Sequence, residues 1–254
     1  MAPGNEQPTT NNEKHMKNEF EAFIDDLRAT HGKNLASVIL YGSAAAGDFV
    51  PQKSDYNLLI ALHKITPKDL RAAHASMREW SKLGHPVPAY FTVSELKDAA
   101  DVFPIEFSQM EAVRKVLYGT DVLANLNFTD QNLRHQIEYE LRSKLMRLRR
   151  RYITAAESVE SLKNLMGESL SSFSALFRAV LLLDGVKPPV SKHAIVALTV
   201  EHLKLDGSPF EKIFNIRENN FADKLDEVEA NRLFGDYMEQ IKHVIASVDA
   251  GRKT

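Results

Sequence analysis

The residues whose types and spacing could do chemistry lie in the segment SVILYGSAAAGDFVPQKSDYNLLIALH, residues 37–63. Gly42 and Ser43 follow an apolar run, at a point where a short helix could begin. The free N–H groups and the dipole of a helix N-terminus favour an anion such as phosphate. Asp55 and Asn57 precede a second apolar run, and side chains two apart on a strand share a face. A phosphate-binding turn opposite two oxygen ligands is what a magnesium–nucleotide site requires.

Two apolar runs must position these side chains, residues 38–41 (VILY) and 58–62 (LLIAL). Their length, their content of Val, Ile, Leu and Tyr, and the flanking Gly, Pro and Asp predict buried strands. Simpler interpretations stay open: Ser43 as a helix N-cap, and Asp55 with Asn57 as turn residues bonded to nearby backbone. We favour a nucleotide site because the Gly-Ser pair, both strands and both oxygen side chains occur together.

This segment resembles the signature of the nucleotidyltransferase superfamily, which includes polymerase β-like enzymes and aminoglycoside adenylyltransferases. That signature is an apolar strand, Gly-Ser, a spacer, and Asp-x-Asp opening another apolar strand. Here it reads as Gly42-Ser43, eleven intervening residues, and Asp55-Tyr56-Asn57 before the second run. The chain departs from the family at Asn57, where the second carboxylate is expected.

The resemblance implies a set of catalytic and metal-binding residues. In the family, the Asp-x-Asp carboxylates and a third acid on a later strand hold the magnesium ions. Asp55 matches the first acid, Asn57 stands in the second position, and Glu106 is the candidate for the third. We choose Glu106 because residues 102–107 read as a strand in which it alternates with apolar neighbours. Its simpler interpretation is a solvent-facing acid.

The phosphates of the nucleotide need donors as well as metal. By the same resemblance, Gly42 and Ser43 are expected to hold the β- and γ-phosphates through backbone N–H and hydroxyl groups. Arg114 and Lys115 are a second, weaker candidate for phosphate binding. The more basic run at residues 142–151 is expected to be a solvated helix face. The nine histidines show no metal-binding spacing.

Strand and helix patterns alternate up to about residue 123, and only helix patterns follow. The expected fold class is therefore α/β plus all-α, with a small mixed-sheet domain followed by a helical bundle. We expect a disordered leader at 1–13, the nucleotidyltransferase-like domain at 14–126 and the bundle at 127–250. Expected helices span about 13–30, 66–83, 92–100, 158–184 and 224–248, and three more are expected to begin at about residues 129, 191 and 208. The expected helix-capping residues are Thr66, Thr92, Thr129, Ser191 and Ser208, with capping-box patterns at Thr66, Thr92 and Ser208. Expected strands lie at 38–41, 58–62, 89–93, 102–107 and 114–119.

The composition describes an ordinary soluble chain with a net charge of −2, so neither nucleic acid nor an acidic membrane is an expected partner. The absence of cysteine excludes disulfides, thiolate metal sites and a cysteine nucleophile, and suits the cytoplasm. No apolar run is expected to be long enough to cross a bilayer.

Two functions follow from these patterns. The first is Mg²⁺-dependent transfer of a nucleotidyl group, AMP from ATP in the first instance, to a hydroxyl of a small molecule or protein. The second is a nucleotide-binding or interaction module that has lost the chemistry, which Asn57 favours. A partner-binding role for the bundle is a weaker third idea. The acceptor, the nucleotide preference and the oligomeric state stay open, with a homodimer as one candidate.

Overall fold

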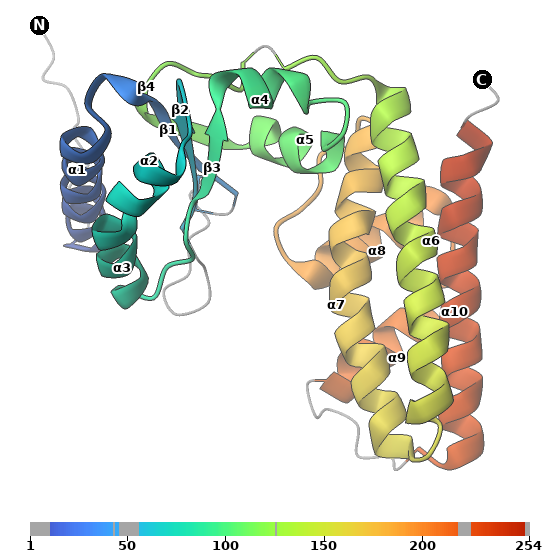
Figure 1. The fold of residues 1–254 in the computed structure, drawn as a ribbon. Coiled ribbons are helices and arrows are strands. Elements are labelled where there is room, and N and C mark those ends of the chain that lie inside the picture. The colour runs from blue at the N-terminus through green and yellow to red at the C-terminus, as the bar shows by residue number, and fades with distance from the viewer. Residues whose placement is uncertain (1–10, 43, 46–55, 125, 218–224, 252–254) are drawn as a thin grey trace, which may run out of the picture. The chain divides into compact units, whose positions relative to one another are not determined.

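The computed structural model describes residues 11–42, 44–45, 56–124, 126–217 and 225–251, and for residues 11–18 the backbone alone. The predicted site residues Ser43 and Asp55 therefore lie outside the described residues. The chain divides into two compact units: Met1–Ala100 with Gln109–Asn127, and Asp101–Ser108 with Phe128–Thr254. The first holds the sheet and the second is helical (Figure 1).

A four-stranded mixed sheet forms the centre of the first unit, in the order β3-β2-β1-β4. β1 runs antiparallel to both β2 and β4, whereas β2 and β3 are parallel. The strands span Leu35–Tyr41 (β1), Asn57–Leu62 (β2), Ala89–Thr92 (β3) and Arg114–Gly119 (β4). Four of the five expected strands are thus present, and the sheet is mixed as predicted.

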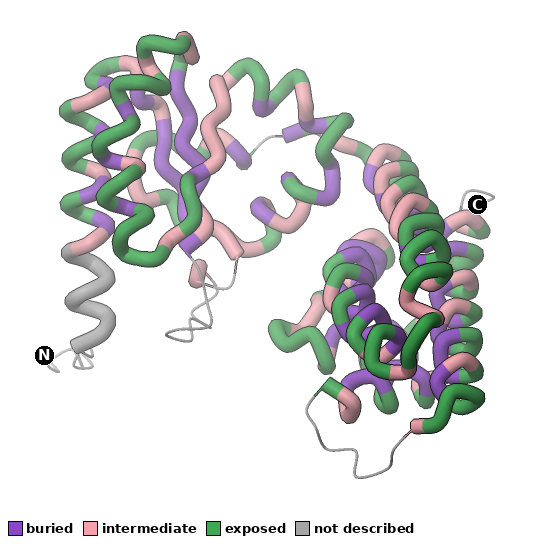
Figure 2. Tube along the Cα trace, turned by 60° about the horizontal axis from the view of Figure 1, so that its bottom comes forward, coloured by how far each residue is buried: buried purple, intermediate pink, exposed green. Residues whose placement is uncertain are grey.

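Helices cover one face of this sheet, where alternate residues of β1 and β2 point into a shared core. Phe23 and Leu27 of α1 pack there with Trp80 of α3, and the Phe23 and Trp80 rings stack at 4.4 Å. The central strands are buried along most of their length (Figure 2). The helical segments of this region are α1 (Asn11–His31), η1 (Gly32–Asn34), α2 (Pro67–Ala72), α3 (His74–Lys82) and α4 (Val93–Asp98).

Local capping fixes where several helices begin. Thr66 and Asp69 form the predicted capping box before α2, and Thr92 with Glu95 forms another before α4. The single helix expected at 66–83 is divided at Ala73 into α2 and α3.

The strand predicted at residues 102–107 is wrong, because the chain forms a helix there, α5 (Pro104–Ala112). Proline suits the first turn of a helix, where its missing N–H has no intrahelical partner. The N–H of Phe107 bonds to the carbonyl of Phe103 at 3.1 Å. Ile105 and Phe107 match a strand pattern locally, but both are buried on a helix.

The second unit is a helical bundle in which α6, α7 and α10 lie side by side along much of their length (Figure 1). Its helices are α6 (Asp130–Ala155), α7 (Val159–Leu183), α8 (Lys192–Leu203), α9 (Ser208–Arg217) and α10 (Glu227–Ala250). Thr129 and Ser191 cap α6 and α8 as predicted. The capping box expected at Ser208 is wrong: Ser208 is the first residue of α9, and its N–H and hydroxyl donate to Asp206.

The helix α7 has the length and apolar character of a membrane-spanning helix, contrary to the expectation from the sequence. Of its most apolar window, 61% is buried within the structure. Phe173, Phe177 and Val180 are among the residues that place it in the core of the bundle. The apolar composition is explained by that core position.

Candidate functional site

Three strand ends meet at one end of the sheet in the first unit. β1 ends at Tyr41, β2 begins at Asn57 and β4 begins at Arg114. Tyr41 is the direct register partner of both Asn57 and Arg114. Residues directly opposite on antiparallel strands present their side chains on the same face. The Asn57 amide and the Arg114 guanidinium therefore flank the Tyr41 side chain on one face of the sheet.

The turn at Gly42 lies directly against Asn57. Gly42 has a φ of +79°, a conformation that glycine adopts without the steric cost other residues incur. A Cβ atom at this position would lie 3.4 Å from Nδ2 of Asn57. The glycine of the motif and the polar residue that opens the second strand are thus neighbours. The predicted partners Ser43 and Asp55 lie outside the described residues.

The backbone N–H of Gly42 is already used, because it donates to the carbonyl of Val113 at 3.2 Å. Ala45 N–H in turn donates to the Gly42 carbonyl at 3.0 Å, which closes a tight turn after the strand. The sequence predicted that the Gly42 N–H binds phosphate, but in the structure it pairs with the backbone of Val113. Because Gly42 lacks a Cβ, no side-chain atom of this residue stands beside Asn57.

The Asn57 side chain is half-buried, and within the described residues no hydrogen bond to it is present. A partly buried amide without a partner retains a carbonyl oxygen that can accept and an NH₂ group that can donate. Asn57 is therefore available to a ligand at this end of the sheet.

Arg114 is fixed in place by its neighbours. Its Nε lies 3.1 and 3.0 Å from the two carboxylate oxygens of Asp121, and its Nη1 donates to the carbonyl of Glu111. Asp121 also accepts from the N–H of Leu123 at 3.1 Å. This anchoring holds a guanidinium on the far side of Tyr41 from Asn57, on the same face of the sheet, but neutralises part of its charge. Sequence reasoning missed Asp121 because it lies beyond the end of β4.

Lys115 does not share the face of Arg114. It pairs in register with Leu40, which packs in the core on the opposite side of the sheet. Successive residues of a strand alternate between faces, so the two cations cannot act on one phosphate chain from the same side. Arg114 and Lys115 are thus separate candidates on opposite faces, and Arg114 is the one that shares the face of Tyr41 and Asn57. Burial raises the pKa of the Tyr41 hydroxyl above its ordinary value.

Glu106 belongs to the second unit and lies in the first turn of α5. Its carboxylate accepts from Nε2 of Gln136 at 2.9 Å, while Oε1 of that glutamine accepts from the N–H of Ile105 at 2.8 Å. The side chain is exposed. Glu106 is therefore a helix residue, and the prediction that it lies on a strand is wrong. Its carboxylate is nevertheless accessible.

The predicted magnesium ligands are all oxygen donors, which is the chemistry that Mg²⁺ prefers. Within the described part of the chain, no group of three or more His, Cys, Asp or Glu side chains could hold a metal ion. Of the predicted ligands at the sheet end, Asn57 is described, and it supplies one neutral oxygen. The donor type fits magnesium, and any charge needed there must come from Asp55 or from the nucleotide.

Comparison with known proteins places the fold. No family model matches the chain, and no curated protein sequence matches it. Among solved structures it is similar to spectinomycin adenyltransferase AAD(9) from Enterococcus faecialis, determined with ATP and spectinomycin. The identity is 14%, the TM-score is 0.50, and the match covers 89% of this chain and 99% of the other. The predicted fold, a small mixed-sheet α/β domain followed by a helical domain, is confirmed, and it is similar to the fold of that adenyltransferase.

Proposed function

We propose that this chain binds a nucleoside triphosphate, in the first instance ATP, and transfers its nucleotidyl group to a hydroxyl of a small molecule. The observation that carries the proposal is that Gly42 and Asn57 are neighbours where β1 ends and β2 begins. A phosphate chain that reaches both the glycine turn and the metal-ligand strand requires these two residues to be neighbours. The similarity in fold to an adenyltransferase supports the same class of function.

Each residue at the sheet end has a role in this proposal. Gly42 leaves room for the phosphates, and Arg114 supplies a fixed positive charge beside them. Ser43 and Asp55 complete the set as a phosphate donor and a metal ligand, and Asn57 offers a neutral oxygen. Magnesium, when bound, would neutralise the triphosphate and favour ionisation of the acceptor hydroxyl.

Transfer forms a bond between the acceptor oxygen and the α-phosphorus and releases pyrophosphate. The acceptor loses a proton in this step, and Glu106, whose exposed carboxylate accepts from the Gln136 amide, stays the candidate base that the sequence offers. We propose a small-molecule acceptor because the AAD(9) structure contains spectinomycin together with ATP. A cytoplasmic location, where ATP and Mg²⁺ are both present, is part of the same proposal.

The second candidate function is a nucleotide-binding module without transfer, and Asn57 is the observation that favours it. An amide in place of a carboxylate removes one negative charge from the metal site. Binding of nucleotide would then persist while the chemistry weakens.

Titration of the purified protein with ATP, GTP, CTP and UTP, with and without Mg²⁺, tests both candidates. We expect one nucleotide to bind saturably, and pyrophosphate to be released when a hydroxyl acceptor is supplied. Saturable binding without release under any acceptor would support the binding module. Failure of all four nucleotides to bind would contradict both.

A further inference from the structure

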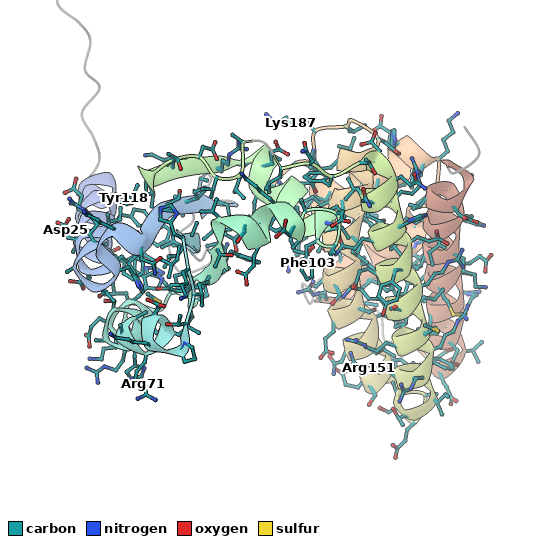
Figure 3. The ribbon with its side chains drawn as sticks, turned by 45° about the horizontal axis from the view of Figure 1, so that its top comes forward. Asp25, Arg71, Phe103, Tyr118, Arg151 and Lys187 are labelled. Carbon is teal, nitrogen blue, oxygen red and sulfur yellow. The ribbon has the colours of Figure 1, made fainter. Side chains whose placement is uncertain are left out.

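A polar groove lies between α6 and α7 in the helical unit, apart from the residues of the proposed nucleotide site. It encloses a cavity of about 170 Å³, far more than the ~10–15 Å³ that holds one water molecule. Figure 3 labels Arg151, which lines the groove from α6. The remaining lining residues are Lys144, Arg147, Leu148, Leu165, Glu168, Ser169, Ser172 and Phe173.

The groove has an apolar floor and a cationic rim. Leu148, Leu165 and Phe173 form the floor and are almost fully buried. Lys144, Arg147 and Arg151 lie three and four residues apart, so they share one side of α6 above that floor. The apolar floor offers no acceptor to these cations, so their partners must be polar lining residues such as Glu168, or a ligand.

Only one of the three cations is neutralised within the described residues. Arg151 donates to Glu168 across the groove at 2.7 Å. In the same described part of the chain, neither Lys144 nor Arg147 has a hydrogen bond or ion pair through its side chain. Three cations and one carboxylate leave a formal excess of two positive charges around the cavity.

Arg142 of α6 differs in this respect: it donates to Glu138 one turn earlier at 2.8 Å and lies 3.9 Å from Asp249. Arg149 and Arg150 also have no side-chain hydrogen bond or ion pair among the described residues, but they are exposed and do not line the cavity. The groove is therefore a place where positive charge is concentrated and left without a counter-charge. Such a place attracts anions and binds best those that accept several hydrogen bonds.

We infer that the groove between α6 and α7 binds a phosphate group, either inorganic phosphate or a phosphomonoester. A phosphate dianion matches the excess of two positive charges, and its oxygens accept from ammonium and guanidinium groups. Lys144 and Arg147 are the binding residues. The Arg151–Glu168 pair fixes one wall, and the Ser172 hydroxyl at the rim offers a further donor.

Calorimetric titration of the full-length protein with inorganic phosphate and with phenyl phosphate, at constant ionic strength, tests this inference. We expect saturable binding at one site in the bundle. The double variant Lys144→Gln/Arg147→Gln should weaken it by about tenfold or more, because two charge-assisted hydrogen bonds are lost. The matched variant Arg149→Gln/Arg150→Gln removes the same charge from the exposed side of α6 and should change binding by less than about twofold.

Absence of saturable phosphate binding, or an equal loss in both double variants, would overturn the inference. Tighter binding of phenyl phosphate would identify the occupant as a phosphomonoester, whereas equal binding would identify free phosphate. The loss of binding in Lys144→Gln/Arg147→Gln separates this site from the proposed nucleotide site, because neither substitution changes a residue of that site.

Chemical labelling of the unmodified protein gives a second readout that does not depend on the folding of a variant. Acetylation followed by mass spectrometry should show that phosphate protects Lys144 and leaves Lys192, an exposed lysine of α8, unprotected. Equal labelling of Lys144 with and without phosphate would contradict the inference.

Discussion

A methyl group placed on the α-carbon of Gly42 would lie 3.4 Å from the side-chain nitrogen of Asn57. The two residues are fifteen positions apart in the sequence, and the pairing of Tyr41 with Asn57 brings them together. The glycine turn and the start of β2 are thus parts of one surface. Changes at either residue should therefore alter the same ligand.

The substitution Gly42→Ala should weaken nucleotide binding by roughly tenfold, because the new methyl group occupies space above Asn57. It should also lower the free energy of unfolding by about 1 to 2 kcal/mol, since the φ of +79° disfavours residues with a Cβ. Fluorescence titration with ATP and urea denaturation measure the two effects separately.

Gly84→Ala is the matched control for this prediction. Gly84 also has a positive φ, +90°, but a Cβ there meets no atom within 4 Å. The control should lose similar stability and keep its affinity for ATP. If both variants lose affinity equally, backbone strain rather than the space above Asn57 is responsible.

Gly119→Ala should be among the most destabilising single changes in the first unit. A Cβ at Gly119 would lie 2.0 Å from the backbone oxygen of Ala36, and its φ is +75°. The clash is with the backbone of β1, which cannot move aside without disrupting the sheet. We expect a loss of roughly 3 kcal/mol or more.

Trp80 provides the measurement for this unit, because it is the single tryptophan of the chain and is 1% exposed. Its fluorescence during urea denaturation should report the unfolding of the sheet domain. Gly32→Ala, where φ is +52° and a Cβ would meet no atom, is the comparison. Equal losses for the two variants would show that the β1 backbone accommodates the methyl group.

The sequence predicted the strands and caps that depend on local signals. Strong apolar runs with Gly and Asp at their ends predicted β1 and β2, and the Thr66 and Thr92 capping boxes marked where α2 and α4 begin. The neighbouring positions of Gly42 and Asn57 also followed from the motif, since both ends of the spacer flank paired strands.

Features that depend on several local signals at once were harder to predict. Ile105 and Phe107 fit a strand, but Pro104 in the first turn and Met110 on the buried side fit the helix that forms. Arg114 and Lys115 are adjacent in sequence yet lie on opposite faces of β4. The partner of Arg114, Asp121, is brought to it by the turn after β4, which no spacing rule indicates.

Acidification should destabilise the first unit through His31. This side chain is 8% exposed, and its Nδ1 is buried without a hydrogen-bond partner among the described residues. Burial lowers the pKa of His31, and the nearby Asp69 opposes this effect only in part. The neutral form is therefore favoured when folded, whereas the unfolded chain takes up a proton below its ordinary pKa of about 6.5.

The direction in which stability changes with pH follows from this difference in proton uptake. Above about pH 6.5 neither state is protonated at His31, and stability is unaffected; below it, stability falls as pH falls towards the folded pKa. One group can contribute a slope of at most about 1.4 kcal/mol per pH unit. His31→Phe, followed by Trp80 fluorescence from pH 7.5 to about 5, should show a shallower decline. Parallel curves for the two proteins would exclude His31 as the cause.

Asn57→Asp should strengthen magnesium binding, and this change separates the two proposed functions. The substitution restores one negative charge at the start of β2. Unit charges 4 Å apart interact by about 4 kcal/mol at an effective dielectric near 20, and the effect on a screened site is smaller. Occupancy of one metal position should therefore rise by roughly 10- to 1,000-fold, since each 1.4 kcal/mol is a factor of ten.

Magnesium titration in the presence of ATP, together with pyrophosphate release, measures binding and chemistry side by side. Asp55→Ala is the inactive control. Tighter magnesium binding with faster release would mean that the native chain is a weakened transferase, and tighter binding without release would favour the nucleotide-binding module. Rapid release by the native protein that Asn57→Asp leaves unchanged would show that Asn57 is not a metal ligand.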